Sequence, residues 1–324
     1  MGPPPSAWDA IARAWQSVRA YPDPDSRHLR QVLAEVCGVP AEWILPGNGA
    51  AELLTWAGRD LSRWDAVGLA VPAFADYDRA LKSFGAKTVR CRLSLEGDRV
   101  LLPDFETQLG DPSRCALLLN NPHNPTGAGW TIAELLPLVE RFALVVVDEA
   151  FMDFLPDTAP YSLVPFVAQF DNLVVVRSLT KFYSVPGLRL GYAIGHPHRL
   201  QRWQQWRDPW PVNALAAAIV PALLGDTEFH QKTLAWLEPA RAQLYRELTD
   251  LSFLRPLPGA ANFLLVETHR SAPQLQENLL KQHRILIRDC LSFPELGDRY
   301  FRVAVKSPAD NHRLATALAK VGVN

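Results

Sequence analysis

The stretch RSLTKFYSVPGLRLGY, Arg177 to Tyr192, follows the apolar run LVVV and decides how the chain is interpreted. Its lysine, Lys181, lies between Leu-Thr and Phe-Tyr, an awkward place for a charge that serves only solubility. Ser178 precedes it by three residues and Arg189 follows it by eight. Serine and arginine can donate to a phosphate, and a lysine whose pKa is lowered by burial is a nucleophile. An isolated S-x-x-K pattern is more often an ordinary basic turn, so the surrounding sequence must decide.

Short, continuously apolar runs alternate with amphipathic stretches from about residue 45 to residue 195. Such runs are typical of strands buried on both faces of a parallel sheet. Phe74–Phe84 and Ile132–Phe142 have the three- and four-residue apolar spacing of helices. This order predicts an α/β domain with a mostly parallel sheet between helices. The expected strands are AVGLAV (66–71), KTVRCRL (87–93), CALLLN (115–120), ALVVVD (143–148) and LVVVRS (173–178).

The pattern changes after Gly225, where a single long helix is expected over 228–250. We therefore predict a large domain at 40–226 and a smaller α+β domain formed by 1–39 and 227–324. The N-terminal helices SAWDAIARAW and HLRQVLAEV are expected to pack against the smaller domain or to reach a partner subunit. The smaller domain should contain the strands ANFLLVE (261–267), RILIRD (284–289) and YFRVAVK (300–306), the helix APQLQENLLKQH (272–283) and a final helix.

The balance of charges points to a small-molecule partner. Lys and Arg number 33 and Asp and Glu 34, so no basic field exists to attract nucleic acid or an anionic membrane. The 4 cysteines are far apart without a CxxC pair, which favours reduced thiols over a disulfide framework or a zinc site, and we expect no metal. No apolar run approaches the length of a membrane span, and the first residues lack a signal-peptide pattern. We therefore predict a cytoplasmic protein.

Polar side chains follow several of the apolar runs. Asn124, in NPHNPTG, comes after CALLLN, and Asp148 opens DEAF after ALVVV. In open α/β sheets, ligands bind at the carboxyl ends of the strands. An asparagine there can donate to an oxygen on a flat ring, although Asn-Pro pairs also favour turns. A carboxylate at the end of a buried strand is costly unless it is paired or functional, although it could instead cap the following segment.

GNGAAELL (47–54) is a glycine-rich turn that opens an apolar helix. Its backbone N–H groups and the helix dipole can bind an anion, ideally a phosphate, although the motif alone is weak. A phosphate cradle, an asparagine, an acidic residue and a Ser/Lys/Arg set are together the parts that hold pyridoxal 5′-phosphate. Its aldehyde forms a Schiff base with a lysine, and its ring nitrogen needs an acidic partner.

The chain resembles the fold-type I, aspartate-aminotransferase-like pyridoxal-phosphate enzymes over nearly its whole length. The resemblance rests on the segments YPDPD, GNGAAEL, PAFADY, NPHNPTG, DEAF, SLTK and GLRLGY, which occur in this order. It implies a large domain with a mostly parallel sheet of the seven-stranded type, plus a smaller α+β domain. Within the family, the chain is similar to the branch that contains threonine-phosphate decarboxylases and histidinol-phosphate aminotransferases.

The resemblance also assigns roles to individual residues. Lys181 would be the Schiff-base lysine, and Asp148 the partner of the pyridinium nitrogen. Tyr21 would reach the cofactor phosphate of a partner subunit, which implies a homodimer. Arg302, in YFRVAV, would bind the substrate carboxylate. The remaining cofactor contacts would be Asn124 on the phenolic oxygen, Phe74 on the ring, Ser178 and Arg189 on the phosphate, and the backbone of Gly49, Ala50 and Ala51.

The choice between decarboxylation and transamination rests on resemblance, because fold cannot decide function. Phe151 lies three residues after Asp148, where aminotransferases of the family commonly have a tyrosine. The similarity favours decarboxylation of L-threonine O-3-phosphate to (R)-1-amino-2-propanol phosphate and CO2, a step toward the nucleotide loop of cobalamin. The alternative is histidinol-phosphate aminotransferase activity, with Phe151 only packing. A pyridoxal-phosphate-binding regulator is disfavoured because no winged-helix module fits, and an inactive scaffold because Lys181 is present.

The substrate phosphate is harder to place. Relatives usually carry a segment with a His-Gly-Gly-Asn motif ahead of the position that GPPP occupies here, and this chain begins MGPPPS. Either the start is truncated, or the gene begins at an internal methionine, or the phosphate is held differently. We expect truncation, which would weaken substrate binding and leave the cofactor site intact. Arg288, in ILIRD, and Arg27 are the remaining cationic candidates for the phosphate, and either could instead be a surface charge.

Overall fold

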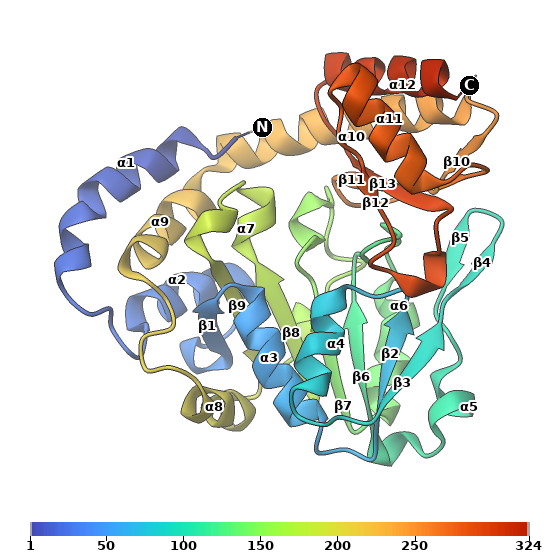
Figure 1. Cartoon of the computed structure of the whole chain (residues 1–324). Coiled ribbons are helices and arrows are strands. Elements are labelled where there is room, and N and C mark those ends of the chain that lie inside the picture. The colour runs from blue at the N-terminus through green and yellow to red at the C-terminus, as the bar shows by residue number, and fades with distance from the viewer. Residues whose placement is uncertain (1, 323–324) are drawn as a thin grey trace.

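A seven-stranded sheet dominates the molecule (Figure 1). The structure is a computed structural model that describes residues 2–322. The strand order is β1-β9-β8-β7-β6-β2-β3, and β9 alone runs antiparallel to its neighbours. The predicted mostly parallel α/β sheet is confirmed. Its strands are β1 (Ile44–Asn48), β2 (Ala66–Val71), β3 (Thr88–Arg92), β6 (Cys115–Asn120), β7 (Leu144–Asp148), β8 (Leu173–Ser178) and β9 (Leu190–Gly195).

Helices cover both faces of this sheet. Successive strand residues point to opposite faces, so Val146 and Val174 contribute to one core and Val145 and Val175 to the other. Because both cores are apolar, the central strands read as continuous hydrophobic runs. The first core includes α3 (Ala50–Leu61), α4 (Ala75–Lys82) and α8 (Pro197–Trp206); the second includes α5 (Phe105–Leu109), α6 (Ile132–Arg141) and α9 (Ala214–Gly225).

A second, antiparallel sheet of four strands lies in the C-terminal part of the chain, in the order β10-β11-β13-β12. The long helix α10 leads from α9 to this sheet (Figure 1). The elements are α10 (Thr227–Thr249), β10 (Leu254–Pro256), β11 (Phe263–Thr268), α11 (Ala272–His283), β12 (Arg288–Asp289), β13 (Tyr300–Ala304) and α12 (Pro308–Val321). A hairpin of β4 (Ser94–Glu96) and β5 (Arg99–Leu101) extends from the larger sheet. No helix in residues 2–322 is long and apolar enough to cross a membrane.

The prediction that 284–289 is one strand is wrong for most of its length, because only Arg288 and Asp289 pair with β13. Arg284 takes a left-handed conformation (φ 55°) as the C-cap of α11. The N–H of Ile285 then donates to Leu279 O, and Gln276 donates to Ile287 O. Residues 284–287 therefore form the end of α11 and the turn after it, and strand pairing begins only at Arg288.

The N-terminal helices α1 (Pro5–Ala14) and α2 (Arg27–Cys37) lie against α9 (Figure 1). Packing of these helices on the smaller domain is therefore wrong for the described residues. The sequence ALAAAIVPALLG makes α9 apolar on all sides, so it can contact the sheet and still bury Ala7 and Ala10 of α1. Ser6 Oγ also donates to Asp226 Oδ2 at 2.7 Å. The domain boundaries stay a prediction.

The close approach of α3 to α4 generates a stability prediction. A Cβ atom at Gly58 would overlap the carbonyl oxygen of Ala80, so Gly58→Ala must push the helices apart. We expect the free energy of unfolding to fall by about 1–3 kcal/mol, measured by urea denaturation. Gly225→Ala is the control, because nothing lies within 4 Å of that position. Equal stability of the two variants would contradict this account of the helix contact.

Candidate active site

The carboxyl ends of β1, β6, β7 and β8 meet at one edge of the large sheet. The residues at this edge are those that the sequence analysis selected. Gly49 follows β1, the turn 121–127 follows β6, Asp148 ends β7 and Ser178 ends β8. Parallel pairing across the centre of the sheet brings these ends together, so residues far apart in the chain share one site.

Asp148 is a buried carboxylate with two donors. The Tyr77 hydroxyl donates to Oδ2 at 2.8 Å, and the N–H of Ala150 donates to Oδ1 at 3.0 Å. Burial raises the pKa of Asp148 to about 6, while the two donors and the nearby Lys181 ammonium act in the opposite direction. A carboxylate held this way is poised to ionise beside a cation.

Its neighbour Glu149 points elsewhere. Its carboxylate forms an ion pair with the Arg177 guanidinium at 2.9 Å and accepts a hydrogen bond from Ser162 Oγ at 2.9 Å. Arg177 also bridges to Asp153, so this buried ion pair ties β7 to β8 below the site. The expectation that at least one of the two acids faces the site is consistent with Asp148, and Glu149 is structural.

Lys181 lies in α7 (Leu179–Phe182), directly after β8. Its neighbours Thr180 and Phe182 are buried, but Lys181 is open to a pocket, so the expected apolar enclosure is incomplete. Its pKa is nevertheless lowered, mainly by partial desolvation and further by the positive charges of Arg189 and Arg302, against the opposing charge of Asp148. A lysine with a lowered pKa is more often neutral and therefore a better nucleophile.

An anion cradle forms where β1 leads into α3. Gly49 has a φ of 76°, and any side chain there would overlap the Arg189 guanidinium. The N–H of Gly49 itself donates to Gly47 O at 2.7 Å, so it is already engaged. Ala50 and Ala51 occupy the first turn of α3, where backbone N–H groups have no partner within the helix. The free donors of the cradle thus come from these two residues and from Arg189.

Ser178 is the N-cap of α7, and it pairs with Gly191, which in turn pairs with Gly47 just before the cradle. Its Oγ lies 2.8 Å from Thr180 Oγ1 and accepts from the N–H of Thr180. The hydroxyl pair of Ser178 and Thr180 is buried and offers additional donors for an anion.

Asn124 and Arg302 meet across the two parts of the molecule. Arg302, in β13, donates from Nη1 to Asn124 Oδ1. Its guanidinium also lies over the Phe263 ring, with Cζ 4.6 Å from the ring centre. Phe151 packs edge-on against Phe263 at 5.2 Å. The residues expected to contact cofactor and substrate are thus joined in one cluster.

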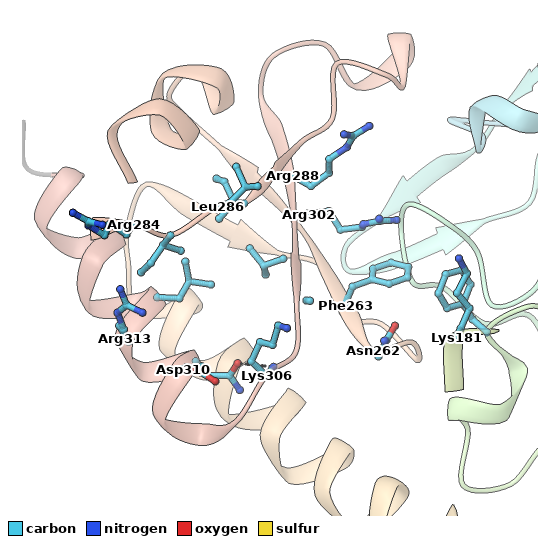
Figure 2. A pocket seen from close by; sticks show the side chains of 17 residues that line it. Lys181, Asn262, Phe263, Arg284, Leu286, Arg288, Arg302, Lys306, Asp310 and Arg313 are labelled. Atoms are coloured by element: carbon cyan, nitrogen blue, oxygen red, sulfur yellow. Dashed lines mark hydrogen bonds between the residues drawn. The ribbon is translucent and has the colours of Figure 1, made fainter. Parts of the chain in front are cut away.

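Lys181, Phe263 and Arg302 line a pocket of about 620 Å³ (Figure 2). Lys181 lies at its end next to the large sheet, and Arg302 and Arg288 approach from the smaller one. Phe151 also lines the pocket. Arg288 is opposite Arg302 in the β12–β13 pairing. Three further basic side chains line the outer part of the pocket: Arg284, Lys306 and Arg313. Asp310 adds one acidic side chain to this lining. The pocket therefore suits an anionic small molecule.

Of the residues singled out in the sequence, Lys181, Phe151, Arg288 and Arg302 line this pocket, and the others, among them Asp148, Asn124, Ser178 and Arg189, do not. Phe74 is 40% exposed and packs edge-on to Tyr77 at 5.6 Å, which places it next to Asp148. Tyr21 is 79% exposed and stacks on Trp210 at 4.4 Å. Arg27 is an exposed residue that pairs with Asp25 at 2.8 Å. Within this chain, Tyr21 and Arg27 stay away from Lys181.

Sequence analysis missed Tyr77 and Asn120. Tyr77 belongs to the quoted segment PAFADY, and its position three residues after Phe74 on a helix was the available signal. Asn120 Nδ2 donates to Asp148 O at 2.7 Å, and its Oδ1 accepts from the N–H of Asn124 at 2.7 Å. It was counted as the last residue of a strand, and nothing in the local pattern distinguishes that role.

The model of the family described as aminotransferase class I and II matches residues 1–318. The chain belongs to this family. It is 38% identical to a threonine-phosphate decarboxylase of Salmonella typhimurium, over 99% of this chain and 88% of that protein. It is 35% identical to a histidinol-phosphate aminotransferase of Symbiobacterium thermophilum, over 98% and 87%. The structure of a Sinorhizobium meliloti histidinol-phosphate aminotransferase in complex with pyridoxal-5′-phosphate superposes with a TM-score of 0.86 at 25% identity, over 99% and 87%.

The cofactor of this family member is pyridoxal 5′-phosphate, and the side chains present fit it. The phosphate cradle depends on Gly49, where a Cβ would occupy the space of the Arg189 guanidinium. Burial raises the pKa of the Asp148 carboxyl group to about 6. A cation next to this group would lower its pKa and favour the charged form. These two features lie at opposite ends of a site that also contains Lys181.

Asp148 makes the stability of the cofactor-free protein depend on pH. Burial raises its folded-state pKa from 3.8 to about 6, so the folded protein holds this proton more tightly than the unfolded chain does. The stability that this group contributes is therefore greatest below about pH 4 and is lost as the pH rises to about 6. We expect Asp148→Asn to be more stable than the wild type at pH 7.5 by about 1–3 kcal/mol, with the difference closing toward pH 4. Urea denaturation at both pH values measures it, and a variant equally destabilised at both would contradict the prediction.

Proposed function

We propose that this protein decarboxylates L-threonine O-3-phosphate to (R)-1-amino-2-propanol phosphate and CO2, in the route to the nucleotide loop of cobalamin. The observation that carries the proposal is Phe151, which brings a ring without a hydroxyl to the pocket of Lys181. The threonine-phosphate decarboxylase described above, which matches at a slightly higher identity than the aminotransferase, gives further support.

In this proposal each side chain at the sheet edge has one task toward the cofactor. Lys181 Nζ would hold its aldehyde carbon, and Asp148 would pair with its ring nitrogen. Asn124 would contact the phenolic oxygen, and Phe74 would pack on the ring. The phosphate is bound by Ser178, Arg189 and the first turn of α3 after Gly49, with N–H groups of Ala50 and Ala51. The lowered pKa of Lys181 and the two donors on Asp148 support the first two assignments.

When bound, the cofactor supplies an electron sink for the pair left when a bond at the substrate α carbon breaks. Arg302 binds the substrate carboxylate and fixes its orientation, since a guanidinium can hold a carboxylate by two parallel hydrogen bonds. As the bond from the α carbon to the carboxylate breaks, CO2 leaves. Lys181 Nζ then delivers one proton to the α carbon in its place. The orientation of the bond from the α carbon to the carboxylate therefore decides between decarboxylation and transamination.

Lys181→Ala is expected to abolish the visible absorbance of the cofactor-loaded protein, because Nζ is the attachment point. Lys306→Ala, in the same pocket, is expected to keep it. Absorption spectra of both purified variants measure the effect. A wild-type protein that stays colourless with added cofactor would contradict the assignment of Lys181. Release of CO2 from L-threonine O-3-phosphate by the wild type then tests the reaction itself.

The alternative function is a histidinol-phosphate or related aminotransferase. The similarity to histidinol-phosphate aminotransferases supports it, and the same lysine, acid and arginine would serve it. Formation of glutamate from 2-oxoglutarate, without CO2 release from L-threonine O-3-phosphate, would establish amino transfer and overturn the decarboxylase.

For the substrate phosphate, the geometry favours Arg288 over Arg27. Arg288 faces the Lys181 pocket, and Arg27 is exposed and paired with Asp25. We expect Arg288→Gln to raise KM for the phosphorylated substrate by about 10- to 100-fold, the effect of losing a charge-assisted hydrogen bond. Arg27→Gln, the matched control, should change KM less than about twofold, as expected for an exposed charge. Steady-state kinetics measure both, and the reverse order would assign the phosphate to Arg27.

The protein is further proposed to work as a homodimer in which Tyr21 contacts the cofactor phosphate of the second copy. Tyr21 lies outside the pocket of its own chain and is 79% exposed, as a residue that acts on another subunit must be. Its ring stacks on Trp210, with ring centres 4.4 Å apart.

A further inference from the structure

Arg90 joins a helix of the large-sheet part of the molecule to a loop of the smaller sheet. It lies in β3, at the edge of the large sheet. Nη1 donates to both carboxylate oxygens of Asp78, in α4, at 2.9 and 2.7 Å. Nε and Nη2 both donate to Oε1 of Glu295, at 2.8 and 2.6 Å. Every nitrogen of the guanidinium is therefore engaged, and its two partners come from segments that are far apart in the chain.

The carboxylate of Glu295 depends on this arginine. The Glu295 side chain is 12% exposed, and Arg90 is its ion-pair partner among residues 2–322. Its Oε2 is buried and has no hydrogen-bond partner in that part of the chain. When one member of a largely buried ion pair is removed, the other is left as an uncompensated charge, which is strongly unfavourable. If Arg90 loses its charge, we therefore expect Glu295 to turn toward water and to move the backbone that carries it.

The two ends of the bridge differ in how firmly they are held. At the Asp78 end, α4 buries one side in the first core and approaches α3 closely. At the Glu295 end lies the β12–β13 loop, residues 290–299, which contains only a single short turn (Pro294–Leu296). A hydrogen bond from Leu296 N–H to Phe293 O, at 3.0 Å, closes this turn. The loop, and not α4, is therefore the end that should move when the bridge is broken.

The β12–β13 loop contacts the residue proposed to bind the substrate phosphate. Arg288 Nη2 donates to Ser292 Oγ, in this loop, at 3.4 Å. Arg288 is exposed and lines the Lys181 pocket (Figure 2). It belongs to a strand of two residues, so pairing with β13 supports it over a very short length. The position of the Arg288 side chain therefore depends on how the loop after it is held.

We propose that Arg90 is a positioning residue that ties the β12–β13 loop to α4 and thereby holds Arg288 at the Lys181 pocket for the substrate phosphate. Arg90 does not line the pocket, so it acts through Glu295 and the loop. A side chain that is held in place beforehand loses less conformational freedom when the ligand binds. The inference rests on the proposed assignment of the phosphate to Arg288, and it holds for either candidate reaction because both substrates are phosphorylated.

Hydrogen exchange of the cofactor-loaded protein, followed by mass spectrometry, measures the positioning independently of activity. In Arg90→Gln we expect the amides of the β12–β13 loop, among them Leu296 N–H, to exchange about three- to tenfold faster. Arg90→Gln combined with Glu295→Gln should exchange more slowly than Arg90→Gln alone, because no unpaired carboxylate remains. Arg90→Lys keeps the charge without the fork of donors and should fall between Arg90→Gln and the wild type.

Steady-state kinetics measure the consequence for the substrate. Arg90→Gln is expected to raise KM for L-threonine O-3-phosphate by about three- to tenfold, with kcat and the dissociation constant of the cofactor within about twofold of the wild type. Arg288→Gln should raise KM further than this. Because Arg90 is proposed to act through Arg288, adding Arg90→Gln to Arg288→Gln should raise KM no more. If the wild type transfers amino groups, the same variants are compared with histidinol phosphate.

Arg141→Gln is the matched control. Arg141, in α6, forms an ion pair with Glu106 of α5, and both helices belong to the large-sheet part of the molecule. Its loss should leave loop exchange and KM unchanged.

Three results would overturn the proposal: unchanged loop exchange in Arg90→Gln, faster exchange with an unchanged KM, or additive effects of Arg90→Gln and Arg288→Gln on KM. The first of these refutes the positioning role whatever reaction the enzyme catalyses. An unchanged KM in Arg288→Gln would refute the phosphate assignment and the positioning role together, so the two failures can be told apart.

Discussion

The buried carboxylate of Asp148 is the constraint on which the rest of the site depends. An acid at the end of a strand flanked by apolar residues is costly to ionise, and its raised pKa expresses that cost. The fold supplies it with the Tyr77 hydroxyl from α4 and a backbone N–H from the following turn. It also surrounds the strand end with neighbours that bear other functional groups. Asn120, Ser178 and Lys181 occupy positions that parallel pairing to β7 and β8 determines.

A second constraint is the contact between the two sheets. The hydrogen bond from Arg302 to Asn124 places a residue of the four-stranded sheet against the turn that follows β6 of the large sheet. The cation over Phe263 and the edge-on packing of Phe151 on that ring extend the contact. The residues proposed to bind the substrate and the cofactor are therefore positioned by one another. A shift of either sheet would move both sets.

Much of this could be predicted from the sequence because its signals are local. The central strands are buried on both faces, so they appear as continuous apolar runs, and β2 and β8 begin and end where those runs do. Polar residues at the ends of the runs then become candidates by position alone. Where the signal is not local, prediction fails. The run RILIRD has strand-like composition, yet helix capping takes its first residues, and the N-terminal helices turn to α9 because that helix is apolar on every side.

The sequence by itself determined the α/β class, the family and the candidate residues at the strand ends. Apolar periodicity and the polar residues that follow each apolar run can both be identified from neighbouring positions in the chain. Only the tertiary structure decided which candidates meet. It joined Asn124 to Arg302, paired Glu149 with Arg177, and revealed Tyr77 and Asn120 as hydrogen-bond partners of Asp148. These are contacts between side chains distant in the chain, and their partners depend on strand order and packing, which no stretch of sequence contains alone.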